Sequence, residues 1–367
     1  MPVDRLRVFA VEETSAQICW AALPVGDVRV SAGDHSVVVA SDGQPGGADI
    51  DGLSPRTRYV LEVDGRPALR FATLAPPPGR LLCKFATVSD LHIGEQRFGG
   101  VFRMRESRPW PDGEPYSLRC ARAALTDALA WGAEAIVVKG DLTQFSRTDQ
   151  FAVAGRLLAD LPVPVETIPG NHDQWGWGAD MWDAMADVGI IMKREPWCRD
   201  LPGVRLIMGL SALPVHKWGE VDDEQRAALV ALAAEAPGAA FVALHHYPQR
   251  FSRPNVYPPG ISGRQAGPLL DELAAANPAV FLSSGHTHRN RRHYHRSVVV
   301  TEVGSTKDYP GVWAGYAVHE GGIRQVVRRI VRPDCIAWTE RTRWALAGIW
   351  GEWSPGPRSH RCFTRAW

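Results

Sequence analysis

The stretch LCKFATVSDLH, residues 82–92, decides how this chain folds and where its chemistry lies. Its first seven residues, 82–88, form an apolar run of strand length, and Asp90 and His92 follow directly. In open α/β sheets, ligands bind outside the carboxyl ends of the strands. We therefore predict that residues 82–88 are a strand of such a sheet and that Asp90 and His92 lie at its ligand-binding edge.

The same pattern occurs at four later apolar runs, which cover residues 135–138, 163–168, 241–244 and 279–282. These runs lead into four polar motifs: Lys-Gly-Asp (139–141), Gly-Asn-His-Asp (170–173), His-His (245–246) and Gly-His-Thr-His (285–288). Each motif alone is common, but together they would bring five strand ends to one edge. Carboxylate, amide and imidazole groups suit Mn, Fe, Zn and similar divalent ions, so the series predicts a metal site.

Glycines precede three of the candidate ligands. Gly140, Gly170 and Gly285 each stand one residue before a polar side chain of these motifs. Glycine accepts backbone conformations that other residues avoid, so we expect these three positions to turn the chain sharply off each strand.

The spacing between the motifs predicts a layered α/β core. Helical patterns cover residues 118–131, 148–161, 222–235 and 265–275, between the apolar runs. Strands that alternate with helices are typical of α/β proteins. Later strands, expected at 297–303, 316–319 and 323–330, follow one another without helices. We therefore expect α/β architecture with α+β character and a mixed or antiparallel stretch at the end of the sheet.

Residues 1–75 are expected to form a separate, small all-β sandwich domain. Ala16, Ile18 and Trp20 recur at every second position, which predicts a strand with one apolar face. Tyr59 follows Leu-Ser-Pro-Arg-Thr-Arg and is placed to bond upstream backbone through its hydroxyl, as in immunoglobulin-type sandwiches. The segment resembles a fibronectin type III domain, and also the small β domain ahead of some purple acid phosphatases.

Two further segments complete the predicted organisation. Residues 76–80 are rich in proline and should form a short stiff linker to the main domain at 81–330. The extension at 331–367 contains five tryptophans, which we expect to pack onto the main domain; a ligand platform is the alternative. They are Trp338, Trp344, Trp350, Trp353 and Trp367.

Charge and hydropathy give no support for nucleic acid or membrane partners. The formal net charge is +1, so no global attraction to a polyanion is expected. The N-terminal residues lack a signal-peptide pattern, and no apolar stretch approaches the ~18 residues of a membrane span. We therefore expect a cytoplasmic protein, in which the six scattered cysteines are reduced and mostly buried.

Motif by motif, residues 82–305 resemble the calcineurin-like metallophosphoesterase superfamily. The resemblance implies a four-layer αββα sandwich, two sheets flanked by helices, around a dinuclear metal centre. It implies seven ligands in three roles: one metal held by Asp90, His92 and His288, a second held by Asn171, His245 and His286, and Asp141 as the bridge. The implied activity is hydrolysis of a small phosphoester, either a diester or a monoester, by a hydroxide that bridges two ions of Mn, Fe or Zn.

The adjacent pair His245 and His246 leaves a choice open. The family pattern matches His245, whereas Pro248 fits a register through His246. We expect His245 to be the ligand.

The same resemblance gives roles to residues beside the ligands. His172 is expected to face the substrate and help the leaving oxygen depart, with Asp173 orienting its imidazole or raising its pKa. Asn171 would also contact the substrate, and Arg97 and Arg103, in the loop after His92, would attract its phosphate. A second basic stretch at 289–296 could do the same, although a solvated surface is as plausible for both stretches.

Two rival functions stand beside this one. A purple-acid-phosphatase-like phosphomonoesterase would explain the leading β domain. That family, however, has glycine at the position of His92 and tyrosine at the position of Gln144, three residues after the bridging aspartate. The ligand pattern instead resembles the cyclic-nucleotide and glycerophosphodiester branch. The second rival is a non-catalytic scaffold or binding protein with this fold, which metal analysis of the pure protein would distinguish.

Overall fold

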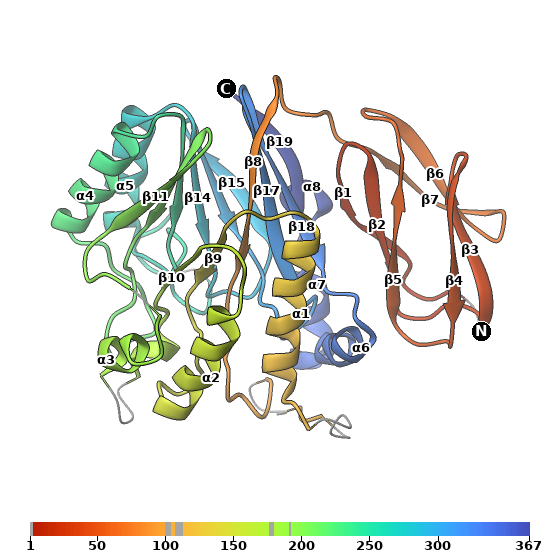
Figure 1. Ribbon diagram of the computed structural model, residues 1–367, viewed down its shortest axis with the longest axis horizontal. Helices are drawn as coiled ribbons and strands as arrows, with labels where there is room; N and C mark the ends of the chain where they lie inside the picture. The colour runs from red at the N-terminus through yellow and green to blue at the C-terminus, as the bar shows by residue number, and fades with distance from the viewer. Residues whose placement is uncertain (1–2, 100–103, 107–112, 176–179, 191, 255) are drawn as a thin grey trace.

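The computed structural model of the chain describes residues 3–99, 104–106, 113–175, 180–190, 192–254 and 256–367. Figure 1 shows a smaller all-β part beside a larger part in which helices flank two sheets. None of the helices in the described residues is long and apolar enough to cross a lipid bilayer.

Two six-stranded sheets form the centre of the larger part. In spatial order, the first sheet contains β10 (Val165–Ile168), β9 (Ile136–Lys139), β8 (Leu81–Val88), β17 (Val312–His319), β18 (Gly322–Arg329) and β19 (Cys362–Ala366). Its first three strands are parallel to one another, and the remaining strands continue antiparallel. This arrangement confirms the antiparallel stretch expected after the alternating strands and helices.

The second sheet has its antiparallel strands at the two edges. In spatial order it contains β11 (Trp197–Leu201), β12 (Val204–Met208), β13 (Ala239–Ala243), β14 (Val280–Ser284), β16 (Val298–Glu302) and β15 (Arg291–His295). The four inner strands are parallel, whereas β11 and β15 pair antiparallel with their neighbours.

The two sheets pack face to face through large apolar side chains. Successive residues of a strand point to opposite faces, so Phe85 of β8 lies between the sheets while Ala86 points toward helices. The Phe85 ring stacks on Tyr316 with centroids 4.8 Å apart. It also meets Phe241 of the second sheet edge-on, at 4.9 Å. These rings hold the two strand layers in contact at their centre.

Helices cover the outer face of each sheet. The first sheet packs against α1 (Tyr116–Ala130), α2 (Thr148–Ala159), α3 (Met181–Ala186) and α6 (Pro333–Thr342). The second packs against α4 (Asp223–Ala234) and α5 (Gly263–Ala276). The order helix, sheet, sheet, helix is visible in Figure 1 and confirms the predicted four-layer αββα sandwich.

The N-terminal part is a sandwich of two small sheets. One contains β1 (Arg7–Val11), β2 (Ser15–Trp20) and β5 (Gly46–Asp51); the other contains β4 (His35–Ser41), β3 (Gly26–Ala32), β6 (Arg58–Val63) and β7 (Arg66–Ala72). The Tyr59 hydroxyl accepts a hydrogen bond of 2.8 Å from the backbone N–H of Ser54, which confirms the expected corner. The resemblance to fibronectin type III domains stays a prediction.

Buried ion pairs join this sandwich to the first sheet. The Glu12 carboxylate lies 2.6 Å from Arg324 Nη2 and 3.0 Å from Arg328 Nη1. Arg328 also reaches Asp49 at 2.6 Å. Gln17 donates a hydrogen bond of 3.0 Å to the carbonyl of Arg329. The apolar core is continuous across the same boundary, so the two parts share one interior.

The segment 331–367 does more than pack its rings onto the main domain. It contributes α6, α7 (Ile349–Trp353), α8 (Arg358–Arg361) and the edge strand β19 of the first sheet. Trp338 is 2% exposed, as expected of a packed ring. Trp344, Trp353 and Trp367 remain 58%, 42% and 40% exposed. The Trp338 ring is therefore buried and Trp350 is partly buried against the same core, whereas the other three rings remain exposed.

Candidate metal centre

The seven predicted ligands meet at the carboxyl edge of the two sheets. They follow the last residues of β8, β9, β10, β13 and β14. Candidate ligand atoms of Asp90, His92 and His288 lie within 4.8 Å of one another, as do those of Asp90, Asp141 and His245. Parallel strands of two packed sheets thus bring together side chains that are distant in the sequence, such as Asp90 and His245.

The distances divide these side chains into two groups. In the first, His288 Nε2 lies 3.3 Å from Asp90 Oδ1 and 3.2 Å from His92 Nε2. In the second, His245 Nε2 lies 3.2 Å from Asn171 Oδ1.

Asp141 lies between the groups. One of its oxygens is 3.4 Å from His92 Nε2, and the other is 3.4 Å from His245 Nε2. Each oxygen faces one group, which is the placement that a bridging carboxylate requires.

Each of the four candidate imidazoles is oriented through its second ring nitrogen. The acceptors are Gln144 Oε1 for His92 (2.7 Å), Lys139 O for His245 (2.8 Å), Pro259 O for His286 (3.1 Å) and Asp308 Oδ2 for His288 (2.7 Å). An acceptor at one nitrogen fixes the tautomer that leaves the other nitrogen unprotonated, as metal ligation needs. The residues therefore fit a pair of divalent ions. Sequence reasoning missed Gln144 and Asp308 as supports, because nothing in their local sequence marks them.

The electrostatics of the site favour cations. Burial alone would raise the pKa of the Asp90 carboxyl, but the neighbouring His288 and His245 hold it below its usual range. His245 likewise lowers the pKa of the buried Asp141. Burial alone would lower the pKa of His288, yet the carboxylates of Asp308 and Asp90 raise it to about 10. The carboxylates that raise the pKa of His288 would stabilise the positive charge of a metal ion in the same way.

Five of the seven candidate ligands have left-handed backbone. The φ angles are 56° at Asp90, 47° at His92, 51° at Asp141, 66° at His286 and 52° at His288. Such angles are uncommon for residues other than glycine and are strained, and they persist only where the surroundings determine the conformation. They cluster here because side chains at the ends of strands must be turned back toward one point.

The three glycines of the motifs act in two ways. Gly140 has φ 87°, so it turns the chain as expected. Gly170 and Gly285 do not need a positive φ, and the expectation of a sharp turn is corrected for both. At Gly170 a Cβ would collide with the Asp141 carboxylate, and at Gly285 it would lie 2.6 Å from Asp90 Oδ2. Gly170 is required because the Asp141 carboxylate packs directly against the backbone, and Gly285 because the Ser89 hydroxyl and the Asp90 carboxylate do.

His172 lies beside the ligands. Its Nδ1 hydrogen-bonds to the carbonyl of Gln144 at 2.9 Å, and its backbone N–H donates to Asp141 Oδ1 at 2.9 Å. Its ring stacks on Trp175 with centroids 4.3 Å apart. These contacts fix the orientation of the ring.

The expected role of Asp173 is corrected by its contacts. Its carboxylate accepts hydrogen bonds from the backbone N–H groups of Leu142 (3.1 Å), Thr143 (2.8 Å) and Gly170 (2.9 Å). It therefore clamps the loop after β9 to the loop after β10. The acceptor that orients the His172 ring is a backbone carbonyl, not Asp173.

His245 and His246 point to different partners. His246 Nδ1 lies 3.1 Å from Ser211 Oγ, whereas His245 Nε2 lies beside both Asn171 and Asp141. Both rings are buried, and each has a nitrogen within 4.8 Å of a ring nitrogen of His286. The geometry favours His245 as the ligand.

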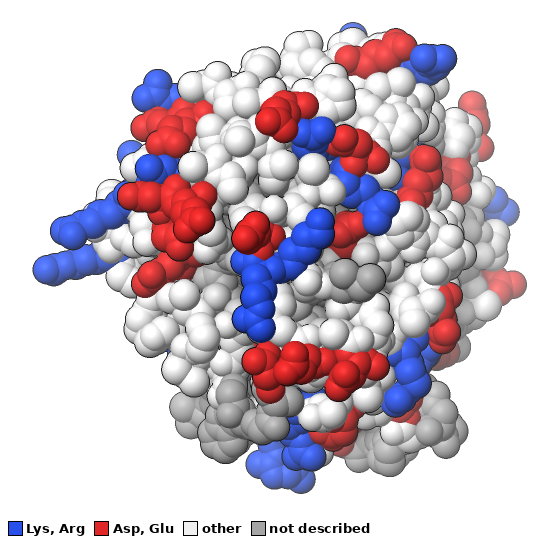
Figure 2. Space-filling model, turned by 60° about the vertical axis from the view of Figure 1, so that its left-hand side comes forward, with Lys and Arg blue, Asp and Glu red and all other residues white. Residues whose placement is uncertain are grey.

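The basic residues contribute less than expected. Arg97 is exposed in the loop after His92, and Arg103 falls outside the described residues. In the second stretch, Arg289 is buried, bonds Glu302 at 2.9 Å and lies 4.9 Å from the centre of the Trp353 ring. Arg296 pairs with Asp271 at 2.5 Å. On the face drawn in Figure 2, basic and acidic side chains of the described residues lie next to one another.

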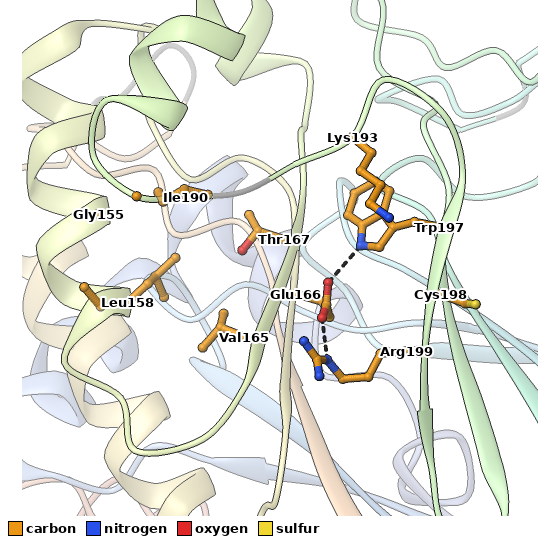
Figure 3. A pocket seen from close by; sticks show the side chains of 12 residues that line it. Gly155, Leu158, Val165, Glu166, Thr167, Ile190, Lys193, Trp197, Cys198 and Arg199 are labelled. Carbon is orange, nitrogen blue, oxygen red and sulfur yellow. Dashed lines mark hydrogen bonds and ion pairs between the residues drawn. The ribbon is translucent and has the colours of Figure 1, made fainter.

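A pocket of about 340 Å³ lies away from the ligands, between α2, β10 and β11. Figure 3 shows the Glu166 carboxylate inside it, bonded by Trp197 Nε1 at 2.8 Å and Arg199 Nε at 2.5 Å. Its lining contains none of the predicted ligands. The carboxylate is already paired, so the pocket does not extend the metal centre.

Comparisons with known proteins find sequence relatives that are named as phosphodiesterases. Similarity is found to a probable cyclic nucleotide phosphodiesterase of Rhodococcus erythropolis, 31% identical over 140 residues, which are 35% of this chain and 44% of that protein. Glycerophosphodiester phosphodiesterase GpdQ of Enterobacter lignolyticus is 26% identical over 177 residues, 47% of this chain and 62% of that protein. The chain thus spans less than two thirds of the length of either relative.

Among solved structures, purple acid phosphatase PPD1 from yellow lupin (Lupinus luteus) seeds aligns with a TM-score of 0.49 and 11% identity, over 89% of this chain and 72% of that one. Residues 83–290 match the family described as calcineurin-like phosphoesterase. Since this match covers more than half of the 367 residues and includes all seven predicted ligands, the chain belongs to the calcineurin-like phosphoesterase family.

Proposed function

We propose that this protein is a metal-dependent hydrolase of small phosphodiesters. The observation that carries the proposal is Asp141, whose two oxygens lie 3.4 Å from imidazoles of two separate ligand groups. The two curated relatives described above are named as phosphodiesterases, which supports a diester over a monoester. A cytoplasmic location and the lack of nucleic acid partners stay predictions of the sequence.

Two divalent ions, Mn, Fe or Zn, would occupy the centre. We assign one to Asp90, His92 and His288, the other to Asn171, His245 and His286, and the bridge to Asp141. Bound there, they would supply an acidified water and neutralise charge on the phosphoester. Nitrogen and oxygen donors in this mixture suit these metals.

The chain's own groups would hold the substrate and move a proton. Because Nδ1–H of His172 donates to a backbone carbonyl, Nε2 is the atom that would carry the second proton of the imidazolium and transfer it to the departing alkoxide. The His172 ring stacks on Trp175, and the backbone N–H of His172 donates a hydrogen bond to Asp141. Both contacts keep the ring beside the ligands. We propose that Asn171 adds a side-chain contact to the substrate and that Arg97 attracts its phosphate from the adjacent loop.

The purple acid phosphatase alternative is disfavoured by one contact. Gln144 occupies the position of that family's tyrosine, and its side-chain oxygen accepts the hydrogen bond of His92 Nδ1 at 2.7 Å. A metal-bound tyrosinate is replaced here by a histidine and the amide that orients it. The two differences from that family, His92 in place of glycine and Gln144 in place of tyrosine, therefore depend on each other through this hydrogen bond.

The test is metal add-back with two substrates. Metal-free full-length protein would be given Mn, Fe, Zn or Mg and assayed on bis(p-nitrophenyl) phosphate and p-nitrophenyl phosphate. We expect activity to depend on Mn, Fe or Zn, with about two ions per chain, and to favour the diester. A preference for the monoester would overturn the substrate class. Fewer than one bound ion and no turnover of either compound would support the scaffold alternative instead.

A further inference from the structure

The tryptophan-rich segment 331–367 reaches the candidate metal centre. Trp350 of α7 donates a hydrogen bond of 3.1 Å from Nε1 to Asp308 Oδ1. The other oxygen of the same carboxylate lies 2.7 Å from His288 Nδ1. One carboxylate therefore joins a candidate ligand to an indole of the C-terminal segment.

The carboxylate in the middle is fully buried. Asp308 is 0% exposed, and the neighbouring Lys307 is 1% exposed. Lys307 Nζ lies 3.5 Å from Asp308 Oδ2 and 2.6 Å from Glu95 Oε2. A buried carboxylate needs donors at both oxygens, because water cannot replace a lost partner. The indole of Trp350 donates to Oδ1, and the Ser305 side chain is a further hydrogen-bond partner of the carboxylate.

The Trp350 ring is itself held against the site. Its centroid lies 5.8 Å from that of Phe98 and 6.3 Å from that of His288. Phe98 follows the Asp90 and His92 loop, so the indole contacts elements that carry ligands of the same metal. The ring is thus placed by packing, and its N–H is aimed at a carboxylate that orients a ligand.

We propose that Trp350 is a positioning residue of the metal centre. Its N–H holds Asp308 in the orientation in which that carboxylate orients His288, so α7 helps set the affinity of the site for a divalent ion. Without this donor, Asp308 would turn toward the Lys307 ammonium, and His288 would lose a defined tautomer and direction. This inference rests on the dinuclear centre proposed above.

The test measures metal affinity rather than activity alone. Isothermal titration of Mn²⁺ into metal-free full-length protein would be compared for the wild type, Trp350→Phe, Asp308→Asn and Trp344→Phe. The phenylalanine keeps an aromatic ring and removes only the donor. Trp344 belongs to the same segment, is 58% exposed, and serves as the matched control. Thermal unfolding of each metal-free variant would report its fold stability separately.

We expect one of the two Mn²⁺ affinities to fall about 10–100-fold in Asp308→Asn, as for other residues that orient a ligand. In Trp350→Phe the same affinity should fall roughly 3- to 10-fold, the effect of one hydrogen bond. Trp344→Phe should match the wild type.

Equal Mn²⁺ affinities in Trp350→Phe and Trp344→Phe would overturn the positioning role while leaving the dinuclear proposal intact. Equal weakening of both Mn²⁺ steps in Trp350→Phe, together with a lower unfolding temperature, would also overturn it, because that result describes a general loss of structure. A wild-type protein that binds no Mn²⁺, Fe²⁺ or Zn²⁺ would overturn both proposals.

Discussion

The metal centre and the junction with the N-terminal sandwich both bury charge, but they balance it differently. At the junction, Glu12 meets Arg324 and Arg328 directly, so each buried charge has an opposite partner. At the metal centre, the candidate ligand carboxylates of Asp90 and Asp141 lie more than 3 Å from the imidazoles that face them, on strained backbone. Removing one member of a directly paired buried charge destabilises a fold, whereas buried carboxylates and imidazoles that converge on one another are suited to bind a cation.

The strongest test of this difference is to remove the proposed bridging carboxylate of Asp141. Asp141→Asn keeps the shape of the side chain but removes the negative charge that would hold two cations together. We expect nearly complete loss of phosphodiester turnover and of one metal per chain. Activity assays and metal analysis check this, with Asp149→Asn as control because that carboxylate is 68% exposed. Wild-type turnover with two ions in Asp141→Asn would rule out the bridge.

A second substitution separates catalysis from metal binding within the same centre. His172→Ala removes the proposed proton donor but none of the proposed ligands. Turnover should fall about 10²–10⁴-fold while metal content stays near that of the wild type. The loss should be smaller for a p-nitrophenyl than for an alkyl leaving group, because an acidic leaving group needs less protonation.

The control for His172 lies at the opposite edge of the first sheet, where His319 pairs with Leu81 at the start of β8. His319→Ala should leave turnover unchanged. If the His172→Ala defect is the same for both leaving groups, or if metal is lost, the acid role is wrong.

A substitution at the junction with the N-terminal sandwich should lower the stability of the fold without lowering turnover. Glu12→Ala removes the carboxylate that two buried guanidinium groups share and leaves Arg324 with Glu13 and Arg328 with Asp49, so it should destabilise the fold by about 1–3 kcal/mol. Turnover of the folded protein should be unchanged, because Glu12 touches no proposed ligand. Chemical denaturation would measure the loss against Asp27→Ala, which removes an exposed carboxylate of the same sandwich. A variant as stable as the wild type would show that the pairs do not join the two parts.

The contacts at this junction also bear on the predicted domain boundary at residues 75–80. We propose that residues 1–75 are a recognisable unit but not a removable one. A chain starting near Arg80 would expose the apolar face shared with the sandwich and leave Arg324 and Arg328 unpaired.

The smallest expected effect is spectroscopic. With Gln144 hydrogen-bonded to His92 instead of a tyrosine at that position, iron-loaded protein should lack an intense tyrosinate band in the visible range. The absorption spectrum of iron-loaded protein checks this, and reductant should preserve or raise its activity. An intense purple colour would place a tyrosine on the metal and return the chain to the purple acid phosphatase alternative.

The fold and the ligand positions could be predicted because both depend on local patterns. An apolar run that ends in Asp-x-His or Gly-Asp specifies a strand and its carboxyl end within a dozen residues. Parallel strands then bring their ends together whatever the loops between them do. For this reason the sequence locates Asp90, Asp141 and His286 at one edge without any knowledge of the loops.

The residues that support the ligands could not be predicted in the same way. Gln144 and Asp308 act through single side-chain bonds to histidines 52 and 20 residues away. Asp173 was misassigned because adjacency in sequence suggested a bond to His172, whereas its carboxylate accepts from backbone N–H groups of Leu142 and Thr143 in the preceding loop. Such contacts depend on loop conformation, which hydrophobic periodicity does not determine.

The left-handed backbone at five ligand positions has a consequence for protein engineering. Each such residue costs of the order of 1–3 kcal/mol, and the surrounding layers supply that energy. A designer who copied the seven side chains onto another scaffold would reproduce the donors but not their directions. A working transplant would have to carry the strand ends, the close-packed Gly170 and Gly285, and the hydrogen-bond acceptors behind each imidazole. Transfer of this centre to another protein therefore requires its backbone framework and not only its sequence motifs.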